Sequence, residues 1–392
     1  MTKPGLDPDL LAGLDDLLTD DEKAVRESVR EMCARLVDPF VAEWFERAEI
    51  PGIRSLTTEL GTMGLLGMQL DGYGCAGMTA TEYGLACLEL EASDSAVRSL
   101  VSVQGSLAMY AIHRWGNEDQ KQRWLPGMAA GRLIGCFGLT EPDHGSDPAN
   151  MRSRARRDGA NWVIDGRKSW ITNGSIADVA VVWAQADDGI RGFAVPTGTP
   201  GFTTLPITHK LSLRASVTSE LVLDGVRIPD DCAFPEVRGL KGPLACLNEA
   251  RYGIVWGSMG AARTALRTAL AYSLQRNQFG RPLAGFQLTQ AKLADMTAEY
   301  VTGVLLALHL GRRKDAGTLR PEQVSLGKLN NVRKALEICR TARTVLGANG
   351  ISLEYPVIRH MNNLESVLSY EGTGEMHTLV VGQALTGIQA FR

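Results

Sequence analysis

Hydrophobic periodicity changes twice along this chain. Apolar residues recur at helical spacing from residue 19 to about 130, short strand-type runs follow between about 134 and 235, and helical spacing returns from about 245 to the end. A chain of 392 residues is long enough for two or three domains with sizeable cores. We therefore expect an α+β multidomain fold, in which a β domain lies between two all-α domains.

Local signals support both kinds of element. Thr19 with Glu22 predicts a capping box at the start of the first long helix, which Pro39 closes. The central region contains four strand-type runs: Trp162–Ile164, Val179–Ala184, Gly192–Val195 and Leu221–Leu223. Three dipeptides read as hairpin turns between strands: Asp165-Gly166, Asp188-Gly189 and Asp224-Gly225. Short strands with frequent turns favour a compact β-barrel or sandwich.

Composition narrows the class of function. Hydrophobic residues make up 44%, charged residues 22%, and the net charge is −3, so no broad basic surface for nucleic acid or an anionic membrane is indicated. No stretch approaches the roughly 18 consecutive apolar residues of a membrane span. The start, Met1–Asp7, lacks the charged and apolar parts of a signal peptide, and the acidic segment after it is unlike a transit peptide. We expect a cytoplasmic protein.

The cysteines and histidines indicate neither a disulfide framework nor a metal site. The seven cysteines are odd in number and scattered, which favours reduced thiols. There is no CxxC motif, and the six histidines have no spacing typical of metal ligands.

A carboxylate near the C-terminus is the best candidate for chemistry. Residues 370–377 read YEGTGEMH, which puts Glu371 between an aromatic ring and a glycine turn, with hydrophobic segments on both sides. A carboxylate that is desolvated there has a raised proton affinity, which suits it to take a proton from carbon. The octapeptide alone is equally compatible with a turn acid that faces water.

Three further motifs precede it in order. Residues 136–142 read CFGLTEP and are followed by Gly145-Ser146-Asp147, residues 168–173 read KSWITN, and residues 276–280 read RNQFG. Together with the YEGT turn they resemble the acyl-CoA dehydrogenase family of flavoenzymes, over essentially the whole chain, and within it the glutaryl-CoA dehydrogenase branch. The resemblance implies an N-terminal α-helical domain at 1–133, a central β-barrel or sandwich domain at 134–240 and a C-terminal four-helix-bundle domain at 241–392.

The cofactor that the resemblance implies is FAD. The chain has no GxGxxG after a strand and no Walker-type loop, so a Rossmann or P-loop site is not supported. On residues alone a Trp-Ile-Thr run is most often just a strand, but by resemblance it lines the flavin ring, with Thr172 near N5. Arg276 and its neighbours would bind the FAD of an adjacent subunit. The residues that the resemblance assigns to FAD are Phe137, Leu139, Thr140, Ser146, Trp170, Ile171, Thr172, Arg276, Gln278, Phe279, Gln287, Thr344, Gly347, Ala348, Thr373 and Glu375. Thr344, Ala348 and the Gly374-Glu375 pair depart from the residues common in the family.

The spacing of Glu91 and Arg98 admits two interpretations. They are seven residues apart, so they share a face if the helix is unbroken, and on spacing alone an ion pair is favoured. The resemblance instead gives Arg98 and Ser99 the distal carboxylate of the substrate, which a guanidinium grips bidentately. The expected substrate-binding residues are Glu91, Arg98, Ser99, Ser146, Asn248, Arg251, Tyr252 and Tyr370. On residues alone, Asn248 and Arg251 are equally readable as the solvated start of a helix.

The chemistry that follows by resemblance is α,β-dehydrogenation of glutaryl-CoA. Glu371 is the base, the flavin takes the β-hydrogen as hydride, and a backbone amide with a flavin hydroxyl holds the thioester carbonyl. Loss of CO₂ and return of the proton from Glu371 then give crotonyl-CoA. An electron-transfer flavoprotein takes the electrons, and a homotetramer, or at least a dimer, is expected. Other short or branched acyl-CoA substrates, a non-decarboxylating glutaryl-CoA dehydrogenase, an acyl-CoA oxidase and a non-enzymatic binding homologue remain as alternatives.

Overall fold

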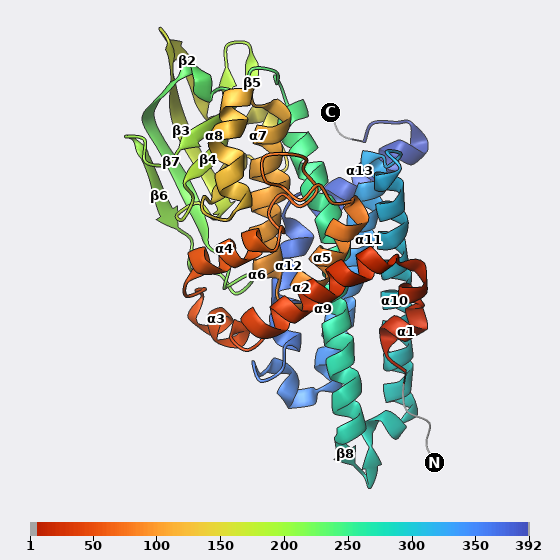
Figure 1. The fold of residues 1–392 in the computed structure, drawn as a ribbon. Helices are drawn as coiled ribbons and strands as arrows, with labels where there is room; N and C mark the ends of the chain where they lie inside the picture. The colour runs from red at the N-terminus through yellow and green to blue at the C-terminus, as the bar shows by residue number, and fades with distance from the viewer. Residues whose placement is uncertain (1–5, 391–392) are drawn as a thin grey trace.

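The computed structural model describes residues 6–390. Residues 1–5 and 391–392 lie outside the described part, and with them the first residues on which the expectation about a leader sequence rests. In Figure 1 a twisted sheet lies at one end of the molecule, a bundle of long helices at the other, and shorter helices between and beside them. The predicted order of helical, β and helical regions is confirmed.

The N-terminal region is a set of mostly short helices. Their bounds are α1 Pro8–Ala12, α2 Asp20–Leu36, α3 Val41–Arg47, α4 Ile53–Thr62, α5 Ala80–Ser93, α6 Ser95–Ser102, α7 Tyr110–Trp115 and α8 Glu118–Ala129. A π-helical segment, Val103–Met109, joins α6 to α7. The predicted capping box is confirmed, because Glu22 N donates to Thr19 Oγ1 (3.2 Å) and Thr19 N to Glu22 Oε2 (2.9 Å) at the start of α2.

The central region is one seven-stranded sheet. Its strands are β1 Gly135–Gly138, β2 Arg154–Asp158, β3 Asn161–Thr172, β4 Val179–Ala186, β5 Gly189–Pro196, β6 Phe202–Pro206 and β7 Thr218–Pro229. The order is β1-β4-β2-β3-β7-β6, with β5 paired to β4, and β1 runs parallel to β4. All four predicted strand runs fall inside strands. A two-residue turn, Asp187-Asp188, joins β4 to β5, so the turn predicted at Asp188-Gly189 is confirmed with a shift of one residue.

Two of the three predicted hairpin turns are wrong. Asp165-Gly166 lies inside β3 and Asp224-Gly225 inside β7, where the pairing of these long strands shifts by one residue. Gly225 N donates to Asp165 Oδ1 (2.7 Å) across this bulge. A side chain on Gly166 would overlap the Ser153 side chain. Gly225 is therefore part of a bulge, and Gly166 permits a close approach of Ser153. Glycines at bulges and close approaches give the same local sequence signal as a turn.

The C-terminal region is a bundle built on three long helices. Its helices are α9 Lys241–Gln275, α10 Gln287–Asp315, α11 Pro321–Val345, α12 Val357–Ser369 and α13 Gly374–Thr386. A small hairpin of β8 Asn277–Gln278 and β9 Arg281–Pro282 lies at the far tip, between α9 and α10 (Figure 1). Glycines bring α9 against α5: a Cβ on Gly260 would overlap the Leu88 carbonyl, and a Cβ on Gly84 would overlap the Trp256 ring. The two helical regions thus share one core.

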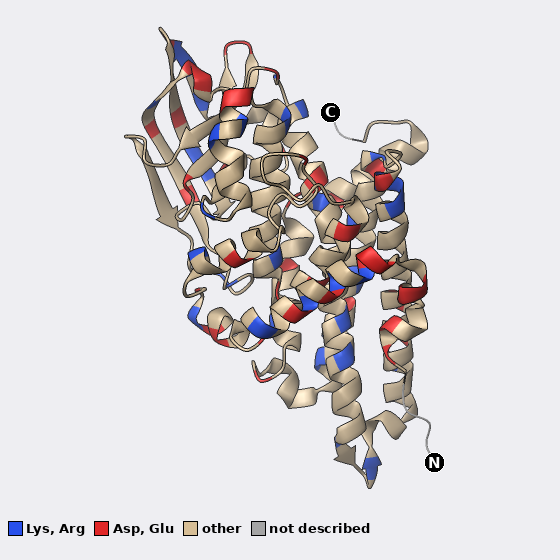
Figure 2. Cartoon of the chain, in the orientation of Figure 1, with Lys and Arg blue, Asp and Glu red and all other residues tan. Residues whose placement is uncertain are grey.

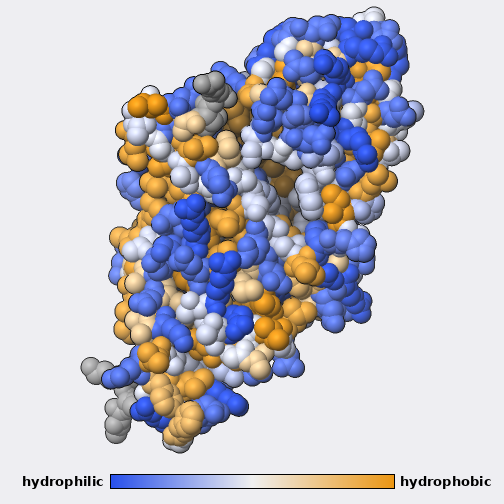
Figure 3. Space-filling view, turned by 180° about the vertical axis from the view of Figure 1, so that it is seen from behind, coloured by the Kyte–Doolittle hydropathy of each residue, from blue (hydrophilic) through white to orange (hydrophobic). Residues whose placement is uncertain are grey.

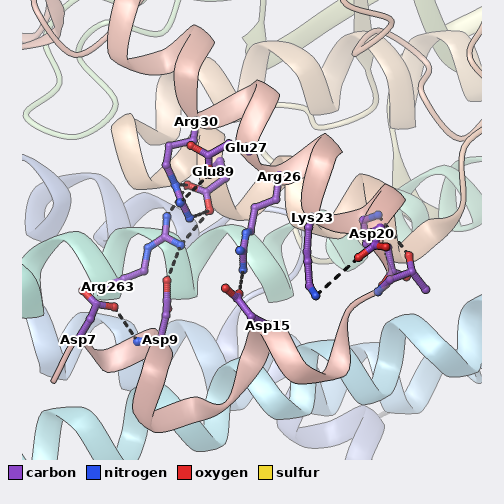
Figure 4. A network of polar contacts seen from close by, with 12 residues as sticks. Asp7, Asp9, Asp15, Asp20, Lys23, Arg26, Glu27, Arg30, Glu89 and Arg263 are labelled. Atoms are coloured by element: carbon purple, nitrogen blue, oxygen red, sulfur yellow. Dashed lines mark hydrogen bonds and ion pairs between the residues drawn. The ribbon is translucent and has the colours of Figure 1, made fainter.

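A cluster of charged side chains links the N-terminal segment to this core through ion pairs (Figure 4). Glu89 of α5 pairs with Arg263 of α9 (2.5 Å) and with Arg30 of α2 (3.0 Å), while Asp9 of α1 pairs with Arg263 (3.3 Å) and Arg267 (2.9 Å). Burial raises the pKa of Glu89, but the two guanidiniums outweigh burial and bring it down to about 2. The side chains of the cluster are therefore charged, and their ion pairs hold α1, α2, α5 and α9 together.

Acidic and basic residues occur in all three regions of the chain (Figure 2). Apolar side chains gather at the tip that carries the β8–β9 hairpin, seen at the bottom of Figure 3, where Phe279 is 93% and Leu288 79% exposed. Within the described residues, no helix has both the length and the apolar character needed to cross a membrane.

Candidate active site

Glu371 lies in the turn between α12 and α13. Its backbone is left-handed (φ 55°), which is uncommon for a residue with a side chain, and Gly372 follows with φ 101°. Thr373 caps α13 by accepting from Met376 N (3.3 Å). A strained, non-glycine residue that the surroundings hold in place is typical of functional sites.

Glu371 is half-buried, and one oxygen of its carboxylate is shielded from water. Its Oε2 atom is buried and has no hydrogen-bond partner among the described residues. Burial raises the pKa of Glu371, and the positive charges of Arg98, Lys328 and Arg251 oppose this rise only in part. Since Oε2 is buried and the pKa is raised, the side chain differs from a fully exposed turn acid and is suited to accept a proton.

Two cationic side chains hold the backbone of this turn. Lys328 Nζ donates to the carbonyl oxygens of Tyr370 and Gly372, at 2.6 Å each. Arg251 Nε donates to the carbonyl oxygen of Glu371 (2.7 Å), and its Nη1 donates to Asn248 Oδ1 (3.2 Å). The sequence reasoning placed Arg251 and Asn248 near the substrate but not against the Glu371 turn, and it missed Lys328 altogether. The available signal was a lysine on the buried stripe of α11, four residues from both Val324 and Val332.

Arg98 lies beside the same turn and is completely buried. Its Nε donates to Glu91 Oε2 (2.7 Å), and both side chains are 0% exposed. Its Nη2 donates to the Tyr370 hydroxyl, which also lies 3.3 Å from Ser99 Oγ. Its Nη1 is buried and has no partner among the described residues. The ion pair expected from spacing is present, and it still leaves one guanidinium nitrogen for a ligand.

The helix that carries this pair is not continuous, contrary to the simplest expectation from the spacing. α5 ends at Ser93, and Asp94 has extended backbone (φ −163°, ψ 142°) and caps α6 by accepting from Ala96 N (2.7 Å). The Asp94 carboxylate also accepts from Arg359 of α12. The break therefore anchors the Arg98 segment to α12, the helix that leads into the Glu371 turn.

The residues expected around the flavin ring divide into buried and accessible groups. The Phe137, Leu139 and Ile171 side chains are buried in the cores, at 7%, 6% and 3% exposure. Trp170 is 61% exposed and left-handed (φ 60°), at a bulge in β3. Thr140 and Thr172 are partly exposed. The accessible groups are thus an indole face and two hydroxyls.

A buried ion pair supports this region. Lys168 Nζ donates to Glu141 Oε1 (2.8 Å) and to the Leu139 carbonyl (3.1 Å), and Glu141 also accepts from the backbone N–H groups of Arg152 and Ser153. Burial raises the pKa of Glu141, but Lys168 and these donors bring it down to about 2. The loop after β1 is therefore fixed to β3. The sequence reasoning quoted both residues but gave them no role.

The remaining cofactor residues lie elsewhere. Arg276, Gln278, Phe279 and Gln287 are exposed at the β8–β9 tip, at the end of the bundle opposite α13 (Figure 1). Thr344, Gly347 and Ala348 are exposed at the end of α11 and the turn after it. Ser146 is exposed in the loop between β1 and β2, and Glu375 in the first turn of α13. One chain does not bring the tip residues to the Glu371 turn.

A cavity opens beside α9. It has a volume of about 300 Å³, and its lining includes Asn248, Glu249, Tyr252, Lys314 and Arg320. Tyr252 is buried and its hydroxyl donates to the Ala80 carbonyl (2.7 Å), so the ring packs as part of the wall. Asn248 lies inside α9, which begins at Lys241, so the interpretation as a solvated helix start is wrong.

Comparisons with known proteins agree with this arrangement. Three family models match: the acyl-CoA dehydrogenase N-terminal domain at residues 19–132, the middle domain at 136–226 and the C-terminal domain at 238–386. The mitochondrial short-chain specific acyl-CoA dehydrogenase of Bos taurus is 33% identical over 371 residues, which cover 93% of this chain and 90% of the relative.

Solved structures are also similar over nearly the whole chain. A glutaryl-CoA dehydrogenase from Mycobacterium smegmatis is 67% identical with a TM-score of 0.98, covering 99% of this chain and 100% of the other. Another from the same organism, in complex with FADH2, is 60% identical with a TM-score of 0.97 and the same coverage. A chain in a structure described as the electron transferring flavoprotein of Acidaminococcus fermentans is 31% identical with a TM-score of 0.91, covering 94% of this chain and 98% of that one.

Proposed function

The chain belongs to the acyl-CoA dehydrogenase family, and from that premise we propose that it oxidises glutaryl-CoA between the carbons α and β to the thioester, with FAD as its cofactor. The observation that carries the choice of substrate is the buried guanidinium of Arg98. It is linked through Tyr370 to the Glu371 turn, and its Nη1 has no partner among the described residues. Similarity to two glutaryl-CoA dehydrogenases supports the same choice.

Glu371 begins the reaction by taking the α-proton. Its buried Oε2 has no partner to compete for the incoming proton, and burial raises its pKa toward the range where a carboxylate accepts a proton from carbon. The left-handed turn and its two cationic supports fix where the carboxylate points. Preorganisation of this kind removes part of the cost of orienting the base.

Arg98 selects the acyl group by its distal carboxylate. Nη1 offers a charge-assisted hydrogen bond to a carboxylate oxygen, and the Tyr370 hydroxyl and Ser99 lie next to it. Glu91 keeps Arg98 charged and oriented. An acyl chain that ends in a methyl group leaves Nη1 unpaired in a buried site, so it is disfavoured by more than the lost hydrogen bond.

The residues present fit a flavin. A flat conjugated ring needs apolar surface on its face and hydrogen-bond groups at its edge, and the exposed Trp170 indole with the hydroxyls of Thr140 and Thr172 offers both. These three residues would hold the ring, and the Lys168–Glu141 pair keeps their two segments together. When bound, FAD supplies an acceptor for the β-hydrogen and its electron pair.

Decarboxylation of the oxidised product is the second step that we propose. Oxidation yields glutaconyl-CoA, whose carboxylate sits one carbon beyond the new double bond. Cleavage of that carbon–carboxylate bond releases CO₂ and leaves the electron pair as a dienolate delocalised onto the thioester oxygen. Glu371, protonated in the first step, returns its proton to the terminal carbon and gives crotonyl-CoA. One carboxyl group then serves as base and as acid.

The proposal also includes an electron acceptor and a second copy of the chain. Similarity to a chain in an electron transferring flavoprotein structure supports such a flavoprotein as the electron acceptor. The exposed Phe279 and Leu288, with Arg276 at the same tip, support assembly of at least a dimer, in which the tip of one subunit completes the cofactor site of another.

Anaerobic titration of the purified flavoprotein with glutaryl-CoA and with butyryl-CoA tests the proposal. We expect glutaryl-CoA to bleach the flavin, with crotonyl-CoA and CO₂ as products, and butyryl-CoA to have little effect. Glutaconyl-CoA without CO₂ would contradict only the decarboxylation step. Equal bleaching by butyryl-CoA would contradict the role of Arg98 and leave a general short-chain dehydrogenase.

A further inference from the structure

Lys328 is a buried lysine whose charge the reaction described above does not use. It lies among the buried residues of α11 and is 2% exposed. A buried ammonium is costly unless its donors are satisfied, and a methionine of similar length would fill the same space without that cost. A lysine at this position therefore indicates a role that a neutral side chain does not have.

The contacts of Lys328 are concentrated on the catalytic turn. Its two hydrogen bonds go to the carbonyl oxygens of Tyr370 and Gly372, the residues before and after Glu371. Its Nζ also lies 6.0 Å from the centre of the Tyr370 ring. A single ammonium thus bridges both ends of the left-handed residue that carries the carboxylate.

Other charged groups face Lys328 from the elements packed around it. Arg251 of α9 and Arg98 of α6 repel its charge, and Glu371 of the turn attracts it. His377 of α13 packs on the same turn, and burial together with Lys328 and Arg251 lowers its pKa to about 3, so it is neutral. Glu371 is therefore the one carboxylate among these groups that gains from the ammonium.

Burial and these charges also act on Lys328 itself. Burial lowers the pKa of Lys328 to about 7, although the charge of Glu371 favours the ammonium. The ammonium and the carboxylate therefore stabilise each other's charged forms, and the loss of one weakens the other.

We propose that Lys328 is a positioning residue for the proton transfer: it holds the two carbonyls that flank Glu371, and its charge, together with those of Arg98 and Arg251, favours the ionised carboxylate that accepts the α-proton. The proposal rests on the assignment of Glu371 as the base. It goes beyond that assignment, because it gives an electrostatic role to a residue outside the set proposed to bind substrate or cofactor.

Two substitutions separate the charge from the hydrogen bonds. Lys328→Gln keeps two N–H donors and removes the charge, while Lys328→Met removes both. Infrared difference spectra of the FAD-bound protein, recorded against pH, follow the protonation of the Glu371 carboxyl group. The Glu371→Gln variant identifies its band. This readout needs no turnover, so it tests Lys328 even if glutaryl-CoA is not the substrate.

We expect the protonation midpoint of Glu371 to rise by about one pH unit or more in both variants, as the loss of a nearby opposite charge requires. Flavin reduction by glutaryl-CoA at pH 7 should slow by at least about 10-fold. Raising the pH should restore much of the rate in Lys328→Gln but not in Lys328→Met, whose turn is no longer held.

An unchanged midpoint in Lys328→Gln would overturn the proposal, even if the thermal unfolding temperature fell, because Lys328 would then be a structural residue only. Failure of Lys328→Gln to fold would also overturn it, since a residue that only positions the turn is dispensable to the surrounding core. If Lys328→Met alone fails to fold, Lys328→Gln still decides the question.

Discussion

Arg98 and Glu91 form a fully buried ion pair across a break in the helix. The Nε–Oε2 distance is 2.7 Å although Asp94, between them, is extended and starts a new helix. Gly257 of α9 makes room for this pair, because a Cβ there would overlap the Glu91 carboxylate. The geometry of the proposed carboxylate receptor is therefore set jointly by α5, α6 and α9.

The first prediction concerns the base. Glu371→Gln should lower the rate of flavin reduction by about 10²–10⁴-fold, since an amide does not accept the α-proton. Binding of glutaryl-CoA should change little, because the side chain keeps its size. Glu365→Gln is the matched control: Glu365 is an exposed acid on α12, paired with Arg340. Near-normal reduction by Glu371→Gln would remove Glu371 from the mechanism.

The second prediction concerns pH. Glu371 must be ionised to accept a proton, and burial raises its pKa above the ordinary value of 4.5. The rate of flavin reduction should therefore fall as pH decreases through this raised pKa, at a higher pH than an exposed carboxylate would give. Single-turnover reduction between pH 4 and pH 9 measures the profile. A midpoint at or below the ordinary value of 4.5 would contradict the prediction.

Sequence patterns predicted the elements better than their junctions. Periodicity located the helical regions and the four strand runs, because each repeats its signal over several residues. The bulge at Asp165-Gly166 and the break at Asp94 were not predicted, because each depends on a partner that is distant in sequence: Gly225 for the bulge and Arg359 for the break.

The sequence likewise indicated only part of the site. The YEGT motif led to Glu371, whose buried carboxylate agrees with the proposed role. The bonds from Lys328 and Arg251 to that turn span 42 and 120 residues of sequence, and no local pattern indicates them. A lysine on an apolar stripe signals only that something buried must accept its hydrogen bonds.

The third prediction concerns the carboxylate receptor. Replacing Arg98 alone would leave Glu91 as an unpaired buried charge, so the double variant Glu91→Gln/Arg98→Met is the better test. Its kcat/KM for glutaryl-CoA should fall by roughly 10- to 100-fold, because a charge-assisted hydrogen bond contributes about 1.5–3 kcal/mol. Its kcat/KM for butyryl-CoA should stay level or rise. An equal loss with both substrates would show that the pair only supports the fold.

The fourth prediction concerns the contact between α5 and α9. A methyl group on Gly260 would overlap the Leu88 carbonyl and lie 2.9 Å from Ala92 N, both backbone atoms. Gly260→Ala should therefore destabilise the protein by about 1–3 kcal/mol, as overpacking does. Gly382→Ala is the control, because Gly382 is also helical and has nothing near its Cβ position. It should stabilise the protein by up to about 1 kcal/mol. Urea unfolding compares them, and equal midpoints would contradict the close approach.

The fifth prediction concerns the ion cluster around Glu89. Glu89→Gln leaves Arg263, which is 2% exposed, without its nearest carboxylate. Removal of one partner of a buried pair costs about 3–5 kcal/mol, so the urea midpoint at pH 7 should fall strongly. Glu322→Gln, which breaks the more exposed pair with Arg320 (3.4 Å), should change the stability by no more than about 1 kcal/mol.

The acid dependence of the same two variants checks the cause. In the folded protein the pKa of Glu89 is about 2 instead of the ordinary 4.5. A depressed carboxyl pKa stabilises the folded state fully above about pH 4.5, and this contribution is lost as pH falls toward 2. The stability of the parent protein should therefore decline more steeply over that interval than that of Glu89→Gln, whose amide does not titrate. Parallel declines would mean that the charge on Glu89 does not contribute to folding, and that the loss at pH 7 comes from packing.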